Sequence, residues 1–171
     1  RRGIVDLVAQ LAAIPGLGDL SMTTNGMLLE RYAGELAQAG LRRINLSLDT
    51  LRPERFHNIT RLGSLEQVLR GREAALEAGL RPVKVNTVVV RGSNDDEIVD
   101  LARLTLLPDW HVRFIEVMPL GTGEHWSEDG VVPTTEIRAR VEAGLGSLVS
   151  VPNETGVGPA RYYELPSAAG T

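Results

Sequence analysis

The chain has 171 residues, of which 43% are hydrophobic and 23% charged, a composition typical of one globular domain with a buried core. A net charge of −4 excludes a globally basic surface for nucleic acid, and the absence of cysteine excludes disulfides and thiolate metal sites. We find no apolar run of the roughly 20 residues that a membrane helix needs, and no signal peptide. The sequence therefore predicts a cytoplasmic domain with no membrane or nucleic-acid partner.

The chain alternates between segments of helical spacing and short apolar segments typical of strands. Apolar residues three and four apart indicate the helices, and Gly or Pro residues mark their ends. Ser64 with Gln67 forms a capping-box pattern, and Asn94 is predicted to cap a further helix. In chain order we expect a helix over 4–13, a strand over 20–25, a helix over 28–39, a strand over 44–49, a helix from Ser64 to Gly79, a strand over 83–90, a helix from Asn94, a strand over 112–118, a helix over 134–143, and strands over 148–151 and 161–165.

This alternation predicts parallel strands that are joined by right-handed helical crossovers. Two architectures fit the order, an open doubly wound sheet and part of a βα barrel. The first predicted element is a helix with no strand before it, which is odd for a complete domain and natural for an excised piece. The residues therefore predict an α/β fold and favour a fragment of a larger one.

Polar side chains alternate with apolar ones along each predicted strand. Because successive side chains of a strand point to opposite faces, one face is apolar and the other polar. Parallel strands buried on both faces would instead be continuous runs of Val, Ile and Leu. The polar face is predicted to contain Ser21, Thr23, Asn25, Asn45, Ser47, Asp49, Lys84, Asn86 and Arg113.

A polar face that successive parallel strands share needs water or a ligand, because an unpaired buried cation costs several kcal/mol. One alternative is a salt bridge, such as Lys84 with Asp49, which would fill a barrel without any ligand. We favour a ligand-holding interior, since active sites gather at the carboxyl ends of strands. Lys84 and Arg113 then suit an anionic substrate, whereas Thr23 and Ser47 suit ribose or phosphate oxygens.

Other polar motifs in the sequence do not by themselves identify a functional site. The glycine-rich segment 121–123 precedes no helix, so we do not interpret it as a phosphate loop. Glu116 is compatible with an acid–base role and with a structural role, and the residues alone leave both open. The three histidines lie far apart in the sequence, without metal-ligand spacing: His57, His111 and His125.

Five segments carry a resemblance to a known enzyme family. Residues 20–26 (LSMTTNG) and 43–49 (RINLSLD) resemble barrel strands of radical S-adenosylmethionine (SAM) enzymes. Residues 82–88 (PVKVNTV), 112–119 (VRFIEVMP) and 158–163 (GPARYY) closely resemble the GTP 3′,8-cyclases that begin molybdenum cofactor biosynthesis. The resemblance covers nearly the whole chain.

The resemblance implies an enzyme, a radical SAM lyase that converts GTP to (8S)-3′,8-cyclo-7,8-dihydroguanosine 5′-triphosphate. It implies that Thr23 and Lys84 bind GTP and that Arg113 is a catalytic residue close to the substrate. Ser47 and Met118 are implied contacts of SAM. The implied cofactors are SAM and two [4Fe–4S] clusters, whose cysteine ligands are absent from this chain.

The resemblance also implies where this segment belongs in a longer enzyme. Residues 1–145 would form a partial TIM-like barrel, about the last four of six βα units. Residues 146–171 would begin the C-terminal extension that leads to the second cluster. The implied partners are GTP, SAM and the missing N- and C-terminal parts of the parent chain, and a homodimer stays open.

We expect the fragment alone to be inactive, because both clusters need thiolates. The alternatives are another radical SAM enzyme and a cluster-free, non-catalytic remnant or interaction module. One departure from the family lies at Arg61, where the family usually has glycine.

Overall fold

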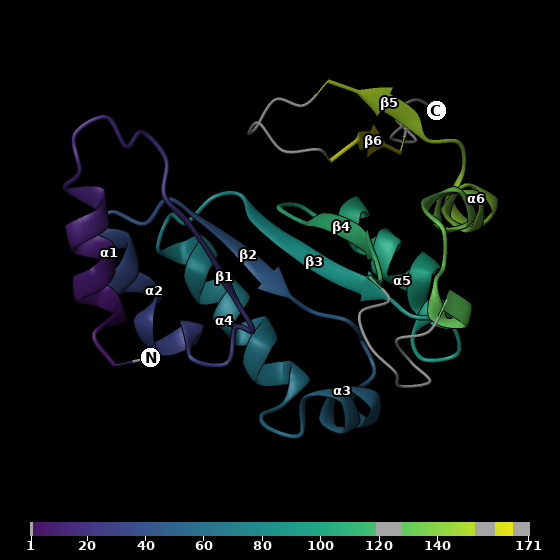
Figure 1. The fold of residues 1–171 in the computed structure, drawn as a ribbon, viewed down its shortest axis with the longest axis horizontal. Coiled ribbons are helices and arrows are strands. Elements are labelled where there is room, and N and C mark those ends of the chain that lie inside the picture. The colour runs from purple at the N-terminus through teal and green to yellow at the C-terminus, as the bar shows by residue number, and fades with distance from the viewer. Residues whose placement is uncertain (1, 119–127, 153–159, 166–171) are drawn as a thin grey trace. The chain divides into compact units, whose positions relative to one another are not determined.

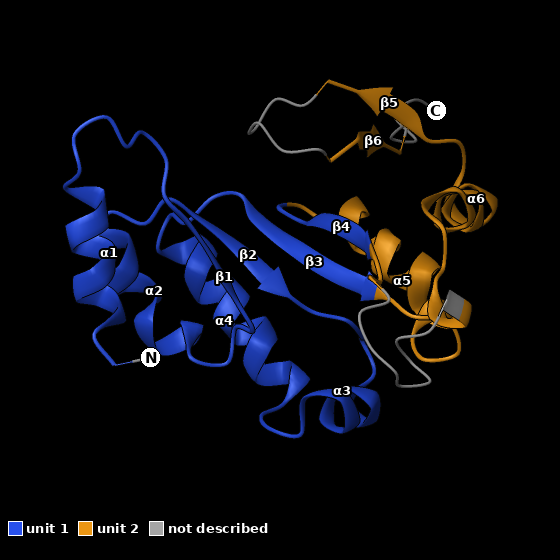
Figure 2. Ribbon diagram, in the orientation of Figure 1, with its two compact units in different colours: residues 1–88, 109–115 blue, residues 89–108, 116–171 orange. Residues whose placement is uncertain are grey.

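The computed structural model describes residues 2–118, 128–152 and 160–165 (Figure 1). The chain separates into two compact units, which Figure 2 shows in different colours. The first unit contains residues 1–88 and 109–115, and the second contains residues 89–108 and 116–171. These units are defined by spatial contacts, so the predicted division at residue 145 stays a prediction.

A four-stranded sheet has the strand order β1-β2-β3-β4. β1 (Ser21–Thr24) pairs in parallel with β2 (Arg43–Ser47), and β2 pairs in parallel with β3 (Val83–Val89). β4 (His111–Glu116) is the neighbour of β3. The predicted α/β alternation with parallel strands is therefore confirmed.

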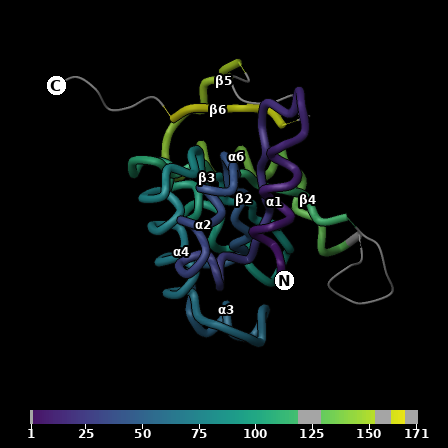
Figure 3. Tube along the Cα trace, turned by 90° about the vertical axis from the view of Figure 1, so that its left-hand side faces the viewer, coloured from purple at the N-terminus to yellow at the C-terminus, as the bar shows by residue number. Residues whose placement is uncertain are grey.

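Helices join the strands of the first unit. α1 (Ile4–Ala12) precedes β1, and α2 (Leu29–Gln38) joins β1 to β2. α3 (Pro53–Thr60) and α4 (Leu65–Glu77) both lie between β2 and β3 in the chain. α2 and α4 pack against each other (Figures 1 and 3).

The apolar face of the strands forms the core of the first unit, as the alternation predicts. Ile44, Leu46 and Val85 are fully buried and belong to one hydrophobic cluster with residues of α2 and α4. Burial of each such side chain contributes about 1.5–3 kcal/mol to stability. The helices contribute Leu29, Ala33, Leu36, Val68 and Ala75 to this cluster.

The second unit contains α5 (Ile98–Arg103), α6 (Thr134–Leu145) and a hairpin of β5 (Val149–Val151) with β6 (Tyr162–Glu164). Short 3₁₀ turns cover Asp95–Glu97, Leu104–Leu106 and Glu128–Gly130. α5 packs against α6 so closely that a Cβ atom on Gly144 would lie 2.6 Å from Val99 Cγ1. The glycine-rich segment 121–123 lies outside the described residues.

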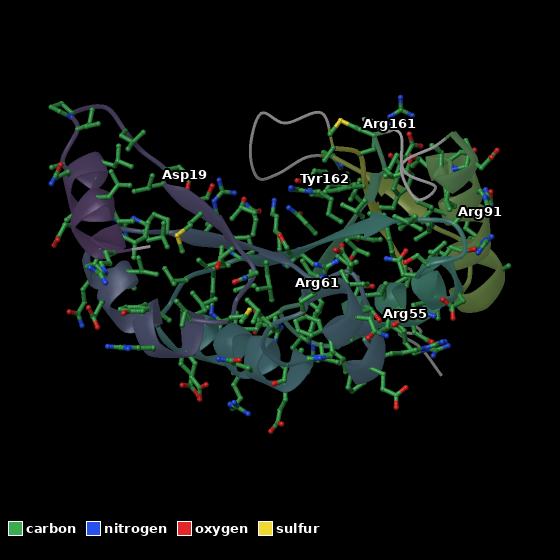
Figure 4. All side chains as sticks on the ribbon, turned by 60° about the horizontal axis from the view of Figure 1, so that its bottom comes forward. Asp19, Arg55, Arg61, Arg91, Arg161 and Tyr162 are labelled. Carbon is green, nitrogen blue, oxygen red and sulfur yellow. The ribbon has the colours of Figure 1, made fainter. Side chains whose placement is uncertain are left out.

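Ion pairs connect the loop after β3 to α6 within the second unit. Arg91, labelled in Figure 4, pairs with Glu136 at 2.7 Å. Arg140 pairs with the same carboxylate at 2.5 Å and with Asp95 at 3.1 Å. The hydrogen bond from Arg91, followed by that from Arg140, lowers the pKa of Glu136 to about 2. Arg91 and Arg140 thus connect the segment after β3 to α6.

Two local features differ from the sequence predictions. α3 was not predicted, although Pro53 at its first turn and Glu54 beside it are typical of a helix start. The predicted cap at Asn94 is wrong, because its Oδ1 atom accepts the Val90 N–H at 2.8 Å and makes no side-chain cap on the 3₁₀ turn. The capping role of Ser64 is confirmed, since its Oγ atom accepts the Gln67 N–H at 3.2 Å.

Within the described ranges no helix has the length and hydropathy to cross a bilayer.

Candidate functional site

Three polar residues form a row across the first three strands. The strand register places Thr23 opposite Asn45, and Asn45 opposite Lys84. Ser47 lies opposite Asn86, two residues further along the same strands. Because register partners in a parallel sheet point to the same side, these side chains share the face that lies opposite Leu46 and the apolar core.

Arg113 reaches the same face from β4. Its Nη1 atom donates to Asn86 Oδ1 at 3.4 Å, a long and therefore weak hydrogen bond. The structure thus brings together four of the residues that the sequence predicts as a site, all of them in the first unit: Thr23, Ser47, Lys84 and Arg113.

Burial differs strongly along this polar face. Thr23 and Ser47 are exposed and Arg113 is half-buried, whereas Lys84 is only 5% exposed. Lys84 is also the single lysine of the chain, among 18 basic residues. A lysine is rarely buried to this degree without interactions that satisfy its ammonium group, so its place in the row is a specific feature of this sheet.

His111 is a polar-face residue that the sequence reasoning missed. It lies two positions before Arg113 on β4, so it has the same parity, and it was interpreted only as a scattered histidine. Burial, followed by the positive charge of Lys84, lowers the pKa of His111, and the Asp109 carboxylate opposes this effect. The strand parity was the signal that identifies it.

Asp49 follows β2 on the parity of Ser47 and closes the carboxyl end of the sheet. Its Oδ1 atom accepts the Val88 N–H at 2.8 Å, and Thr87 Oγ1 donates to the Leu48 carbonyl at 2.7 Å. Burial raises the pKa of Asp49, and the Val88 N–H acts in the opposite direction. These bonds extend the contact between β2 and β3 beyond Ser47. The alternative of a Lys84–Asp49 salt bridge stays a prediction.

The turn after β1 is fixed by its own side chains. Thr24 Oγ1 accepts the Gly26 N–H at 3.1 Å, and Asn25 Oδ1 accepts the Met27 N–H at 3.3 Å. Gly26 has φ 78°, a left-handed conformation that favours glycine. The side chains of Thr24 and Asn25 therefore stabilise the turn, whereas the side chain of Thr23 lies on the polar face.

Met118 and Glu116 lie in the second unit, so the structure does not relate them to the polar face. Met118 is 68% exposed. Glu116 accepts hydrogen bonds from the backbone N–H and, at 2.5 Å, from the hydroxyl of Thr134, the first residue of α6. These two bonds, the hydroxyl bond first, lower the pKa of Glu116. A carboxylate at a helix N-terminus is stabilising, and this structural role accounts for Glu116.

A parallel sheet with one helix-covered apolar face and one polar face defines an α/β protein with a candidate ligand-binding side. The sequence profile described as "Radical SAM superfamily" matches residues 1–105, and the chain belongs to that superfamily.

Relatives point to one kind of enzyme within the superfamily. The chain is 48% identical to the GTP 3′,8-cyclase of Pelotomaculum thermopropionicum and 51% identical to that of Heliobacterium modesticaldum. Each match covers 100% of this chain, but only 53% and 52% of the respective relative. The chain therefore spans about half the length of the curated relatives it matches.

The donor set of this chain fits nucleotides and does not fit an iron–sulfur cluster. The sequence contains no cysteine, and the ranges that the structure describes hold no group of three His, Cys, Asp or Glu side chains able to bind a metal. [4Fe–4S] clusters are normally held by cysteine thiolates. By contrast, the hydroxyls, amides and two cations of the polar face match the groups that bind phosphate and ribose.

Proposed function

We propose that this chain is part of a GTP 3′,8-cyclase, which converts GTP to (8S)-3′,8-cyclo-7,8-dihydroguanosine 5′-triphosphate in molybdenum cofactor biosynthesis. The observation that carries the proposal is the polar row of Thr23, Asn45 and Lys84, with Arg113 on the same face. The names of the relatives, which match the whole chain, support this reaction over other radical SAM reactions.

Lys84 and Arg113 are the proposed cationic contacts of the substrate. The ammonium group of Lys84 acts as a point charge toward a phosphate, whereas the planar guanidinium of Arg113 donates in a fork and orients what it binds. Arg113 is proposed as the catalytic residue, because it would hold GTP where the reaction occurs. Thr23 would add a neutral hydroxyl contact to GTP.

Ser47 and Met118 are proposed as contacts of SAM, which would supply the radical chemistry of the superfamily. Ser47 lies one strand away from Thr23, and its exposed hydroxyl suits a ribose or carboxylate oxygen. The proposed contact of Met118 with SAM rests on the sequence resemblance alone. Both [4Fe–4S] clusters are assigned to residues outside this chain, so the fragment alone is proposed to be inactive.

The proposed fold of residues 1–145 is a partial TIM-like barrel, about the last four of six βα units, with the polar face inside it. Residues 146–171 would begin the C-terminal extension. We propose a cytoplasmic enzyme whose partners are GTP, SAM and the remaining parts of its parent chain, with a homodimer left open. Holding GTP and SAM together in a water-excluding barrel is what the protein would contribute to such a reaction.

A chimera tests this proposal directly. Residues 1–171 replace the matching half of the Heliobacterium modesticaldum GTP 3′,8-cyclase, which is 51% identical to them. After anaerobic cluster reconstitution, the chimera is expected to consume GTP and SAM and to form the cyclised nucleotide. A chimera that holds both clusters and cleaves SAM, yet forms no such product from GTP, contradicts the proposal.

A further inference from the structure

The turn after β1 lies between β2 and α4, with glycine at both contact points. A Cβ atom on Gly26 would lie 2.5 Å from Leu46 Cδ1 and 3.0 Å from Val68 Cγ1. A Cβ atom on Gly71 of α4 would lie 2.6 Å from the carbonyl oxygen of Gly26 and 3.1 Å from Leu29 Cβ. Real Cβ atoms essentially never have a heavy atom closer than 3.0 Å, so the 2.6 Å approach means that α4 touches the turn through the bare backbone of Gly71.

A hydrogen bond adds to this contact. Gln67, one helical turn before Gly71, donates from Nε2 to the Met27 carbonyl at 2.9 Å. Gln67 is itself fixed at the start of α4, because Ser64 caps its N–H. α4 thus contacts the turn at two neighbouring residues. Gly71 packs against Gly26, and Gln67 donates a hydrogen bond to Met27.

Glycine inside a helix is unfavourable by itself, so its position needs a packing reason. Gly71 has that reason, because the backbone of the turn occupies the space where its side chain would be. Gly34 of α2 is a matched contrast, since a Cβ atom there would meet nothing within 4 Å. Gly71 therefore serves the placement of the turn rather than the formation of the helix.

We propose that Gly71 and Gln67 are positioning residues for the substrate side of the polar face. They set how far the turn stands from α4, and the turn begins directly after Thr24, the residue that follows Thr23 at the end of β1. Displacement of the turn moves the end of β1 and, with it, the Thr23 hydroxyl relative to Lys84. Both residues lie on α4, which packs against the apolar core of the sheet. The effect on GTP rests on the proposed function.

The test has a structural arm and a functional arm. In the 171-residue chain, amide hydrogen exchange of Gly26 and Met27 is measured for Gly71→Ala, Gln67→Met and the control Gly34→Ala. Gly71→Ala and Gln67→Met are expected to exchange about 10-fold faster at these amides, the effect of one lost contact. Gly34→Ala is expected to match the unsubstituted chain. Gln67→Met keeps a helix-forming side chain, so it remains informative if Gly71→Ala fails to fold.

The functional arm uses the chimera with the Heliobacterium modesticaldum enzyme. Gly71→Ala and Gln67→Met are expected to raise the KM for GTP about 2- to 10-fold, as for one lost neutral hydrogen bond, with a smaller change for SAM, whereas Gly34→Ala should leave both unchanged. Unchanged turn amides, or a disturbed turn with an unchanged KM for GTP, overturns the proposal. If the unsubstituted chimera forms no product, the proposed function fails, and the exchange comparison alone still decides whether α4 fixes the turn.

Discussion

Arg61 ends α3 in a conformation that suits glycine better than arginine. Its φ is 60°, and its N–H donates to the His57 carbonyl at 2.8 Å, so it closes the helix in the left-handed region. A side chain in that region costs about 1–2 kcal/mol. Glycine removes this strain but adds about 0.5–1 kcal/mol of unfolded-state entropy. We therefore expect Arg61→Gly to stabilise the first unit by about 0.5–1 kcal/mol.

Urea unfolding of the 171-residue chain, followed by circular dichroism, measures this difference. Arg61→Ala is the matched control, because it removes the exposed guanidinium but keeps the Cβ atom that causes the strain. Only the glycine variant should gain stability. Asp109→Gly provides a contrast: Asp109 also has a positive φ, of 61°, but it pairs with Arg81 at 2.5 Å and should lose that contact. Equal stability of Arg61→Gly and Arg61→Ala refutes the backbone argument.

Two further predictions concern Glu116 and the clusters. Glu116→Gln keeps a hydrogen-bond acceptor but loses the negative charge, so it is expected to lower stability at pH 7 by about 0.3–1 kcal/mol, the typical value of a charge at a helix N-terminus. Because the pKa of Glu116 is lowered in the folded chain, this difference is present above its usual 4.5 and should vanish as the pH falls below it, which a pH series of unfolding curves checks. A difference that stays constant in acid contradicts this role. The purified chain, reconstituted anaerobically with iron and sulfide, should bind no [4Fe–4S] cluster and form no 5′-deoxyadenosine. Absorbance near about 400 nm that survives gel filtration would overturn the second prediction.

The polar face was predictable because strand parity is a local property. Period-two alternation placed Thr23, Ser47 and Lys84 on one side, and the observed register brings them into neighbouring rows. The register itself could not be predicted, since it depends on how the helices pack. His111 has the same parity as Arg113, but it lies one residue before the predicted strand over 112–118, so the sequence reasoning did not include it.

Other features depended on contacts between distant segments. α3 has eight residues and one buried apolar side chain, Phe56, so its helical period is short and weak. Asn94 and Asp95 match a capping pattern in sequence, yet in the fold they hold backbone N–H groups of the preceding loop. The close contact of Gly71 with Gly26 has no sequence signal, because it arises where two elements meet.

The effect of a Lys84 substitution on GTP binding tests the central claim that this polar face holds a nucleoside triphosphate. In the chimera, Lys84→Ala should weaken GTP binding by about 1.5–3 kcal/mol, roughly 10- to 150-fold, and SAM binding much less. Arg81→Ala removes a nearby exposed cation that pairs with Asp109, and it should leave both affinities unchanged. Calorimetric titration of each variant with GTP and with SAM measures the two losses. A larger loss for GTP alone agrees with the account, and equal losses for both ligands contradict it.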